Sequence, residues 1–152
     1  MQNLNYGVIG NCSTAALISE KGAIEWLCFP EFDSPSVFAA ILDRQKGGHF
    51  GFKVTSDYKV TQSYVPHTNI LSTHFESEEG AFDVVDFMPC YPTSDGKDFY
   101  RPAEIYRYIR WAKGRPRMKV DYRPAPNYAR GKTIYNVTSQ YVETYSSVEN
   151  KD

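Results

Sequence analysis

Acidic side chains are the residues of this chain that could carry acid–base chemistry. Two carboxyl groups facing one another across a sugar can hydrolyse a glycosidic bond, one as the acid and the other as base or nucleophile. Asp83 and Asp86 lie three residues apart in an apolar segment, and this spacing points two side chains to opposite faces of a strand. We predict solvated or cross-strand pairing roles for both. No catalytic pair is recognised among the scattered acids Glu25, Glu31, Asp33, Asp43, Asp83 and Asp86.

The other reactive side chains also lack the spacing that a site requires. His49, His67 and His74 follow no metal-ligand pattern, so we assign them structural or surface roles. Ser13 lies next to Cys12 but has no positioned histidine after it. The chain contains neither a G-x-S-x-G elbow nor a G-x-G-x-x-G phosphate loop. We therefore predict no catalytic residue, no metal site and no cofactor.

The composition excludes several classes of protein. Of the 152 residues, 41% are hydrophobic and 23% are charged, which is ordinary for a globular domain and too apolar for a disordered tail. Because 17 basic residues nearly balance 18 acidic ones, no nucleic-acid or membrane surface is indicated. No run approaches the ~20 apolar residues of a membrane helix, and no secretory signal is recognised. Three cysteines without C-x-x-C spacing predict buried free thiols and a cytoplasmic location.

Alternation of apolar and polar residues dominates the segments that must position these side chains. Two apolar runs flank the turn Ser19–Gly22 and predict a hairpin. Alternation resumes at His49 and recurs in residues 104–111. In the latter segment one face carries Ile105, Arg107, Ile109 and Trp111. Many short strands with turns between them predict an all-β fold, an antiparallel β-sandwich.

A helix-start signal interrupts the strand pattern at Ser34-Pro35, with serine as the N-cap and proline at the first helical position. Apolar residues that share one helical face follow it, and Gly47-Gly48 stands beyond its end. We predict one short helix near residues 35–43. A second irregular region, Pro89–Pro102, is rich in turn-forming residues and predicts a long loop.

A family pattern runs in order through nearly the whole chain. It begins at Ile9–Ile18, strengthens at Gly22–Pro30 and becomes specific at Phe32–Asp43. It continues in register at Gly47-Gly48, Tyr64–Leu71, Val85–Pro89 and Pro124–Arg130. These segments resemble the N-terminal, trehalase-like β-sandwich domain of glycoside hydrolase family 15, the glucoamylase and trehalase-like group.

The resemblance implies a supersandwich type of fold. It also implies that this chain is one domain of a longer enzyme whose catalytic residues lie in another domain. Residues 1–152 would form the N-terminal β-sandwich domain, truncated relative to the family domain. The catalytic (α/α)6 barrel, which carries the two catalytic glutamates in this family, is absent from the chain. The implied role is a non-catalytic domain that supports the barrel and its active-site rim. The implied partners are that C-terminal barrel, a glucan or trehalose at the rim, and a second copy through exposed strand edges.

Two loops that carry family motifs are the candidate rim. In loops on a rigid sandwich, Asn11 and Asp33 could hydrogen-bond sugar hydroxyls, and Phe32 or Trp26 could stack on a ring. Ser13 is the fifth candidate; it and Glu31 stand where the family pattern often has arginines, which leaves the substrate open. The alternative is structural: Asn11 and Asp33 would serve turns and Trp26 would belong to the core.

Two other functions remain open from the sequence. A free-standing carbohydrate-binding module needs an exposed aromatic platform, which Tyr106 and Tyr108 could supply from one strand face. A chain that is an enzyme by itself would release glucose, and a single substitution such as Asp33→Asn would abolish that activity.

Overall fold

Strands make up the regular structure of residues 4–54 and 57–147, which are the residues that the computed structural model describes. The first sheet, sheet A, has the order β1-β2-β3-β5-β12, with β4 paired to β3. Its strands are β1 (Tyr6–Gly10), β2 (Ala15–Ser19), β3 (Ile24–Cys28), β4 (Ser36–Phe38), β5 (His49–Val54) and β12 (Met118–Arg123).

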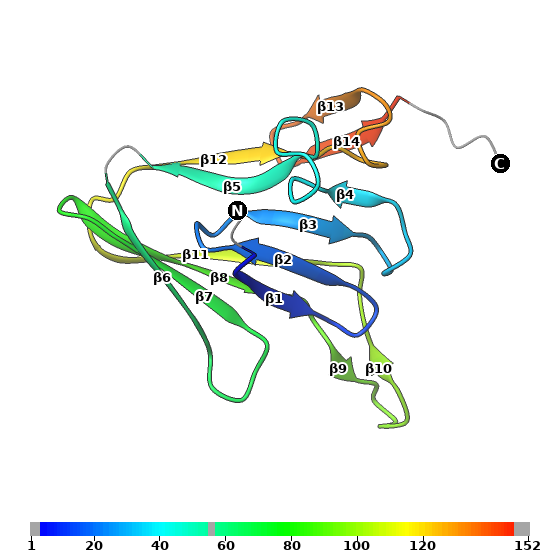
Figure 1. Cartoon of the computed structure of the whole chain (residues 1–152). Helices are drawn as coiled ribbons and strands as arrows, with labels where there is room; N and C mark the ends of the chain where they lie inside the picture. The colour runs from blue at the N-terminus through cyan, green and yellow to red at the C-terminus, as the bar shows by residue number, and fades with distance from the viewer. Residues whose placement is uncertain (1–3, 55–56, 148–152) are drawn as a thin grey trace.

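The second sheet, sheet B, faces sheet A and has the order β11-β8-β7-β6 (Figure 1). Its strands are β6 (Lys59–Tyr64), β7 (Leu71–Glu76), β8 (Gly80–Phe87) and β11 (Tyr106–Gly114). Two short hairpins stand apart, β9 (Tyr91–Pro92) with β10 (Phe99–Tyr100) and β13 (Thr133–Val137) with β14 (Val142–Ser146). All pairings are antiparallel, so the all-β antiparallel prediction is confirmed.

The period of two in the sequence becomes the inside and outside of a sandwich-like arrangement. In β7 the side chains of Leu71, Thr73 and Phe75 are buried, whereas those of His74 and Glu76 are partly exposed. Alternating side chains leave a strand on opposite faces, so one face of each sheet can be apolar. The main core joins residues of both sheets, namely Ile9, Ile18, Ile24 and Leu27 of sheet A with Leu71 of sheet B.

Aromatic rings fill the other end of the space between the sheets. Phe75 and Phe82, on neighbouring strands, stack with their centroids 4.6 Å apart. Phe52 of sheet A meets both rings edge-on. Phe82 and Val84 are fully buried, so this second cluster ties β8 to β5.

A buried ion pair within sheet B also contacts sheet A through its arginine. Arg107 on β11 lies directly opposite Asp86 on β8, and its guanidinium contacts both carboxylate oxygens, at 2.7 and 3.1 Å. The same guanidinium donates to the backbone carbonyls of Phe50 on β5 and of Gly22 in the turn before β3, and it lies over the Phe50 ring. Side-chain exposure is 4% for Arg107 and 0% for Asp86. The predicted pairing role of Asp86 is therefore confirmed, and a solvated role is wrong.

The predicted helix near residues 35–43 is wrong, because the described residues contain no helix. Ser36–Phe38 form strand β4, and the Ser36 and Val37 carbonyls accept hydrogen bonds from the backbone amides of Asn127 and Ala125. Residues 39–43 then make one turn, in which the amides of Leu42 and Asp43 donate to the Ala39 carbonyl. Pairing on both sides favours the extended backbone over the helix that local spacing predicts.

Candidate functional site

The two motif-bearing loops lie side by side at one end of the fold. The first joins β1 to β2 and the second joins β3 to β4 (Figure 1). The Phe32 amide donates to the Ser13 carbonyl at 3.0 Å, and the Thr14 hydroxyl donates to the Cys28 carbonyl at 2.6 Å. The structure thus brings residues 11–14 and 29–35 together into one surface, which we call the rim surface.

Asn11 supports the rim surface from below. It is 1% exposed. Its Oδ1 accepts hydrogen bonds from the amides of Ser13 and Thr14, and its Nδ2 donates to the Pro102 carbonyl, all at 3.1 Å. Both lone pairs of Oδ1 and one of the two Nδ2 hydrogens are therefore engaged within the protein. The Asn11 side chain is therefore engaged in the turn that begins the rim surface, and it offers little surface to a ligand.

The other loop candidates face the solvent. Phe32 is 63% exposed, and the side chain of Asp33 is exposed beside it. Ser13 is half-buried, and its backbone carbonyl accepts a hydrogen bond from the Phe32 amide. An exposed ring next to a carboxylate and a hydroxyl is the combination that binds sugars, since a ring stacks on the apolar face of a sugar and polar groups bond its hydroxyls.

Trp26 lies on strand β3 and belongs to neither of the two loops. It is half-buried on β3, and its ring packs against Tyr128 with a centroid distance of 6.4 Å. Tyr128 also contacts the thiol of Cys28 at 3.8 Å. Trp26 is thus held in an aromatic contact on sheet A.

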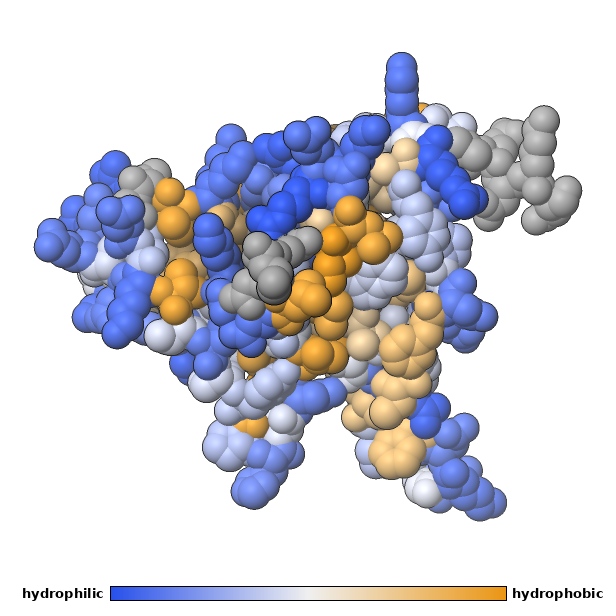
Figure 2. Space-filling view, in the orientation of Figure 1, coloured by the Kyte–Doolittle hydropathy of each residue, from blue (hydrophilic) through white to orange (hydrophobic). Residues whose placement is uncertain are grey.

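The β9–β10 hairpin adds aromatic residues to the same end of the molecule. Tyr91, Phe99 and Tyr100 are each about half exposed, and Figure 2 shows hydrophobic side chains over this hairpin. The hydrogen bond from Asn11 to Pro102 ties its C-terminal side to the rim surface. The sequence predicted a long loop here. The signal that was overlooked is the turn at Asp95-Gly96, where Gly96 has a φ of 66°, between aromatic residues.

Replacing Asn11 by alanine is expected to lower the free energy of unfolding by about 2–3 kcal/mol, because two amides and a buried carbonyl lose their partner. Urea unfolding followed by circular dichroism measures this change. The matched control is Phe32→Ala, where the ring is 63% exposed and the expected change is within about 0.5 kcal/mol. Equal effects of the two substitutions would contradict the structural role of Asn11.

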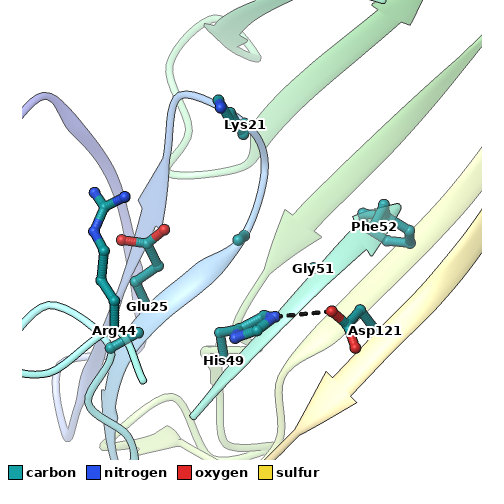
Figure 3. Close-up of a pocket in the computed structure, with 9 residues that line it drawn as sticks. Lys21, Glu25, Arg44, His49, Gly51, Phe52 and Asp121 are labelled. Atoms are coloured by element: carbon teal, nitrogen blue, oxygen red, sulfur yellow. Dashed lines mark hydrogen bonds and ion pairs between the residues drawn. The ribbon is translucent and has the colours of Figure 1, made fainter. Parts of the chain in front are cut away.

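A polar hollow of about 260 Å³ lies on the outer face of sheet A, and the sequence did not predict it. Figure 3 shows Arg44 and Glu25 side by side at one margin and the His49–Asp121 contact at the other. Small residues form the floor between them, Ala23, Ala40 and Gly51. The polar residues come from β3, β5, β12 and the loop after β4. Because these elements are distant in sequence, no local spacing could have indicated the hollow.

The carboxylates of this hollow are held by neighbours. Burial alone would raise the pKa of Asp121, but hydrogen bonds from Arg123, His49 and Lys53 outweigh it and lower that pKa to about 2. Burial, together with donation to the Glu25 carboxylate, raises the pKa of the Tyr6 hydroxyl to about 12. Asp121 is therefore ionised at neutral pH and unsuited to act as a proton donor.

Asp121→Asn is expected to reduce the stability of the protein at neutral pH and to have a much smaller effect at pH 2. The folded-state pKa lies below the ordinary value, so the ionised carboxylate stabilises the fold above about pH 4, and this is lost as the pH falls toward 2. Partial contact with water limits the contribution to about 1–2 kcal/mol. Unfolding free energies of both proteins between pH 2 and pH 7 check this. A difference that stays constant over the whole range would contradict it.

Asp83 also has a structural partner on each side. His74 Nδ1 lies 2.6 Å from one carboxylate oxygen, and Arg110 donates to the other at 2.7 Å. These contacts lower the pKa of Asp83 despite the opposing effect of burial. Asp83 faces outward with these partners and Asp86 faces sheet A, so the prediction of opposite faces is confirmed.

The histidine and cysteine predictions have different outcomes. His49 and His74 contact Asp121 and Asp83, and His67 is exposed in a turn, as expected of structural or surface residues. All three cysteines are free, but only Cys28 is buried; the prediction of burial is wrong for Cys12 and Cys90, which lie in loops. The described residues contain no cluster of metal-ligating side chains. They also contain no helix of the length and apolarity that crossing a membrane requires.

Comparisons with known proteins all find similarity to trehalases. The model of the family described as "Trehalase-like, N-terminal" matches residues 5–149. Trehalase from Thermoplasma volcanium is 36% identical over 132 residues, which cover 85% of this chain and 20% of the relative. Trehalase from Mycolicibacterium smegmatis is 33% identical over 141 residues, again 20% of its length. Trehalase 1 from Sulfolobus acidocaldarius is 51% identical over 85 residues, which are 55% of this chain and 14% of the relative.

No solved structure matches the chain. The chain spans about a fifth of the length of the trehalases that it matches over most of its own residues. Since the family model covers nearly all of it, the chain belongs to the family of trehalase-like N-terminal domains.

Proposed function

We propose that this chain is the non-catalytic N-terminal domain of a longer, trehalase-type glycoside hydrolase of family 15. In that protein it packs against a C-terminal catalytic (α/α)6 barrel and lends the rim surface to the margin of the active site. The observation that carries the proposal is coverage: the chain matches trehalases over most of its own length but only about a fifth of theirs. The names of these relatives favour trehalose over an α-glucan as the substrate of the whole protein.

The environment of the carboxylates supports a non-catalytic role. Glycoside hydrolysis needs two carboxyl groups roughly 5–10 Å apart that are free to exchange protons with a sugar between them. Asp83, Asp86 and Asp121 instead contact arginines of their own sheets. Glu25 accepts a hydrogen bond from Tyr6. Each of these carboxylates is bonded to a neighbouring side chain, and it would have to break that contact before it could exchange a proton with a sugar.

The rim surface supports the second part of the proposal. Phe32 and Asp33 are exposed on a loop that is held by backbone hydrogen bonds to its neighbour, so their positions are fixed without a ligand. A preformed edge of this kind binds with little loss of conformational entropy. Phe32, Asp33 and Ser13 are the residues that would touch the substrate or the barrel, and Asn11 would position them.

Glucose release from trehalose tests the proposal. Residues 1–152 alone are expected to release none, and the longer protein that contains them is expected to be active. In the longer protein, Phe32→Ala should raise the KM for trehalose with a smaller change in kcat, and Leu42→Ala, which removes an equally exposed side chain outside the rim surface, should change neither. Hydrolysis by residues 1–152 that Asp33→Asn abolishes would overturn the non-catalytic role.

A free-standing carbohydrate-binding module is the second candidate function, and one aromatic contact favours it. The Tyr106 ring stacks on Phe87 with an interplanar angle of 6° and a centroid distance of 5.1 Å. Tyr106 and Tyr108 are 47% and 62% exposed on the outer face of sheet B. Calorimetric titration of residues 1–152 with trehalose and maltooligosaccharides separates the two functions. Saturable binding that Tyr108→Ala removes would favour the module; its absence would favour the supporting domain.

A cytoplasmic location also belongs to the proposal. Cys12 and Cys90 are exposed free thiols, which persist in a reducing compartment and oxidise elsewhere.

A further inference from the structure

Three hollows meet at Arg44, beside sheet A. The polar hollow of about 260 Å³ (Figure 3) adjoins two smaller ones, of about 200 and 120 Å³, and Arg44 lines all three. Their linings follow the order of the sheet, from Tyr6 of β1 and Ser19 of β2 to Asp121 and Arg123 of β12. The hollows therefore form one polar groove across the strands, with the 260 Å³ hollow as its largest part.

The floor of the largest hollow is deep because three positions on it have almost no side chain, namely Ala23, Ala40 and Gly51. Gly51 lies within β5, between β3 and β12, and its φ is outside the left-handed region, so the backbone does not require a glycine there. Glycine weakens a central strand, and in such a position it often marks a place where a ligand approaches closely. A Cβ at residue 51 would fill part of the floor, 3.0 Å from the Ala23 Cβ.

The two carboxylates of this hollow differ in how far they are engaged. Asp121 contacts Arg123 at 2.7 Å and Lys53 at 3.2 Å. Glu25 accepts a hydrogen bond from the Tyr6 hydroxyl at its Oε2, and its Oε1 has no hydrogen-bond partner among the described residues. The Oε1 atom of Glu25 is therefore an acceptor that the hydroxyl group of a ligand can use.

Two cations of the hollow, by contrast, have no counter-charge in contact. The side chains of Lys21 and Arg44 form no hydrogen bond and no ion pair with another residue that the structure describes. Both are exposed, and Figure 3 shows Arg44 beside Glu25, with Lys21 at another margin of the hollow. Lys46, which lines the 200 Å³ hollow together with Arg44, is also exposed. Since Asp121 is matched by cations of its own, the site carries a net positive charge.

We infer that this hollow binds a monosaccharide phosphate, a sugar ring that carries one phosphate monoester. Arg44 and Lys21 would hold the phosphate, because a guanidinium bonds two phosphate oxygens at once and an ammonium adds a second positive charge. A sugar hydroxyl would donate to Oε1 of Glu25, and the apolar face of the ring would rest on the methyl groups of Ala23 and Ala40. Such a site would exist whether or not the longer protein is a trehalase.

A neutral sugar fits the hollow less well. Phe52 belongs to the lining, but its ring meets Phe75 and Phe82 edge-on between the two sheets, so it is not free to stack on a sugar. A neutral ligand would also leave Lys21 and Arg44 without a counter-charge. The phosphate of a charged sugar supplies that counter-charge.

Calorimetric titration of residues 1–152 tests this site, with glucose 6-phosphate as the probe and with glucose and inorganic phosphate as comparisons at one ionic strength. Glucose 6-phosphate is expected to bind saturably and more tightly than either comparison. Arg44→Ala should weaken this binding by about 10-fold or more, because charge-assisted hydrogen bonds are lost. Arg115→Ala is the matched control, since Arg115 is exposed and lines none of the three hollows; it should leave the affinity unchanged.

A second variant tests the floor separately from the cations. Gly51→Ala places a methyl group in the floor and should weaken binding of glucose 6-phosphate by about 5-fold or more, while binding of inorganic phosphate stays unchanged. The inference is overturned if glucose 6-phosphate does not bind, or if Arg44→Ala and Arg115→Ala weaken its binding equally. Inorganic phosphate that binds as tightly as glucose 6-phosphate would exclude a sugar on the floor, and glucose that binds as tightly would exclude a role of the two cations; either result overturns the inference.

Discussion

Replacing Arg107 by alanine is expected to lower the free energy of unfolding by about 3–5 kcal/mol, which is the usual cost of removing one partner of a buried ion pair. Arg107 and Asp86 are almost completely buried, and their contact is bidentate. Without the guanidinium, the Asp86 carboxylate remains in the core without a counter-charge. The carbonyls of Gly22 and Phe50 lose their donor at the same time.

Arg107 also connects the two sheets, so the effect of its loss extends beyond one ion pair. Its donors reach β5 and the turn before β3, and its guanidinium lies 4.8 Å from the Phe50 ring centroid and 5.0 Å from that of Phe52. Such cation–π contacts add to the stability when the cation is desolvated. We expect the urea midpoint of Arg107→Ala to fall sharply, with β5 and β11 losing hydrogen-exchange protection together.

Arg110→Ala is the matched control for Arg107→Ala. Arg110 lies on the same strand and contacts Asp83 with similar distances, but its side chain is 62% exposed. Exposed ion pairs contribute about 0–1 kcal/mol. Similar losses from the two substitutions would show that burial of Arg107 does not matter. A double replacement, Arg107→Met with Asp86→Leu, should recover much of the stability, because it leaves no unpaired charge.

The position of Arg107 shows how far the sequence predicts this fold. Alternation placed Arg107 on one face with Ile109 and Trp111, and that face does point inward. The spacing of Asp83 and Asp86 likewise predicted opposite faces correctly. Period-two patterns fix the face of a side chain because pleating is a local property of a strand. They do not fix which distant strand will supply the counter-charge, so the Arg107–Asp86 pair could not be identified beforehand.

The failed predictions depend on contacts between distant residues. Ser36 and Val37 are extended because residues 125–127 bond to their carbonyls, a partner about 90 positions away. The helix signal at Ser34-Pro35 is real as a local preference, but tertiary pairing overrides it. The hydrogen bond from Asn11 to Pro102 is likewise a contact between distant residues that the sequence does not indicate.

The rim surface was partly predictable and the polar hollow was not. Both motif-bearing loops were selected from the sequence, and they meet because β1, β2 and β3 are consecutive neighbours in sheet A. Antiparallel neighbours place alternate turns at the same end of a sheet. The hollow instead combines Arg44, His49 and Asp121 from a loop and two strands that are far apart in the chain. Only the assembled sheet brings those side chains together.

Replacing Phe82 by alanine is expected to cost about 3–5 kcal/mol, the range for removing a buried aromatic side chain. Phe82 is fully buried at the centre of sheet B, where it stacks on Phe75 and meets Phe52 and Tyr58 edge-on. Its removal leaves a cavity between rings that are anchored on β5, β7 and the segment before β6. These strands cannot close the space without breaking their own pairing.

Two substitutions define how this result should be interpreted. Phe99→Ala removes an identical ring that is 51% exposed on β10, and it should change the unfolding free energy by no more than about 0.5 kcal/mol. Phe82→Leu fills part of the cavity and should cost less than Phe82→Ala. If Phe82→Ala and Phe99→Ala had equal urea midpoints, the aromatic cluster would not hold the sheets together.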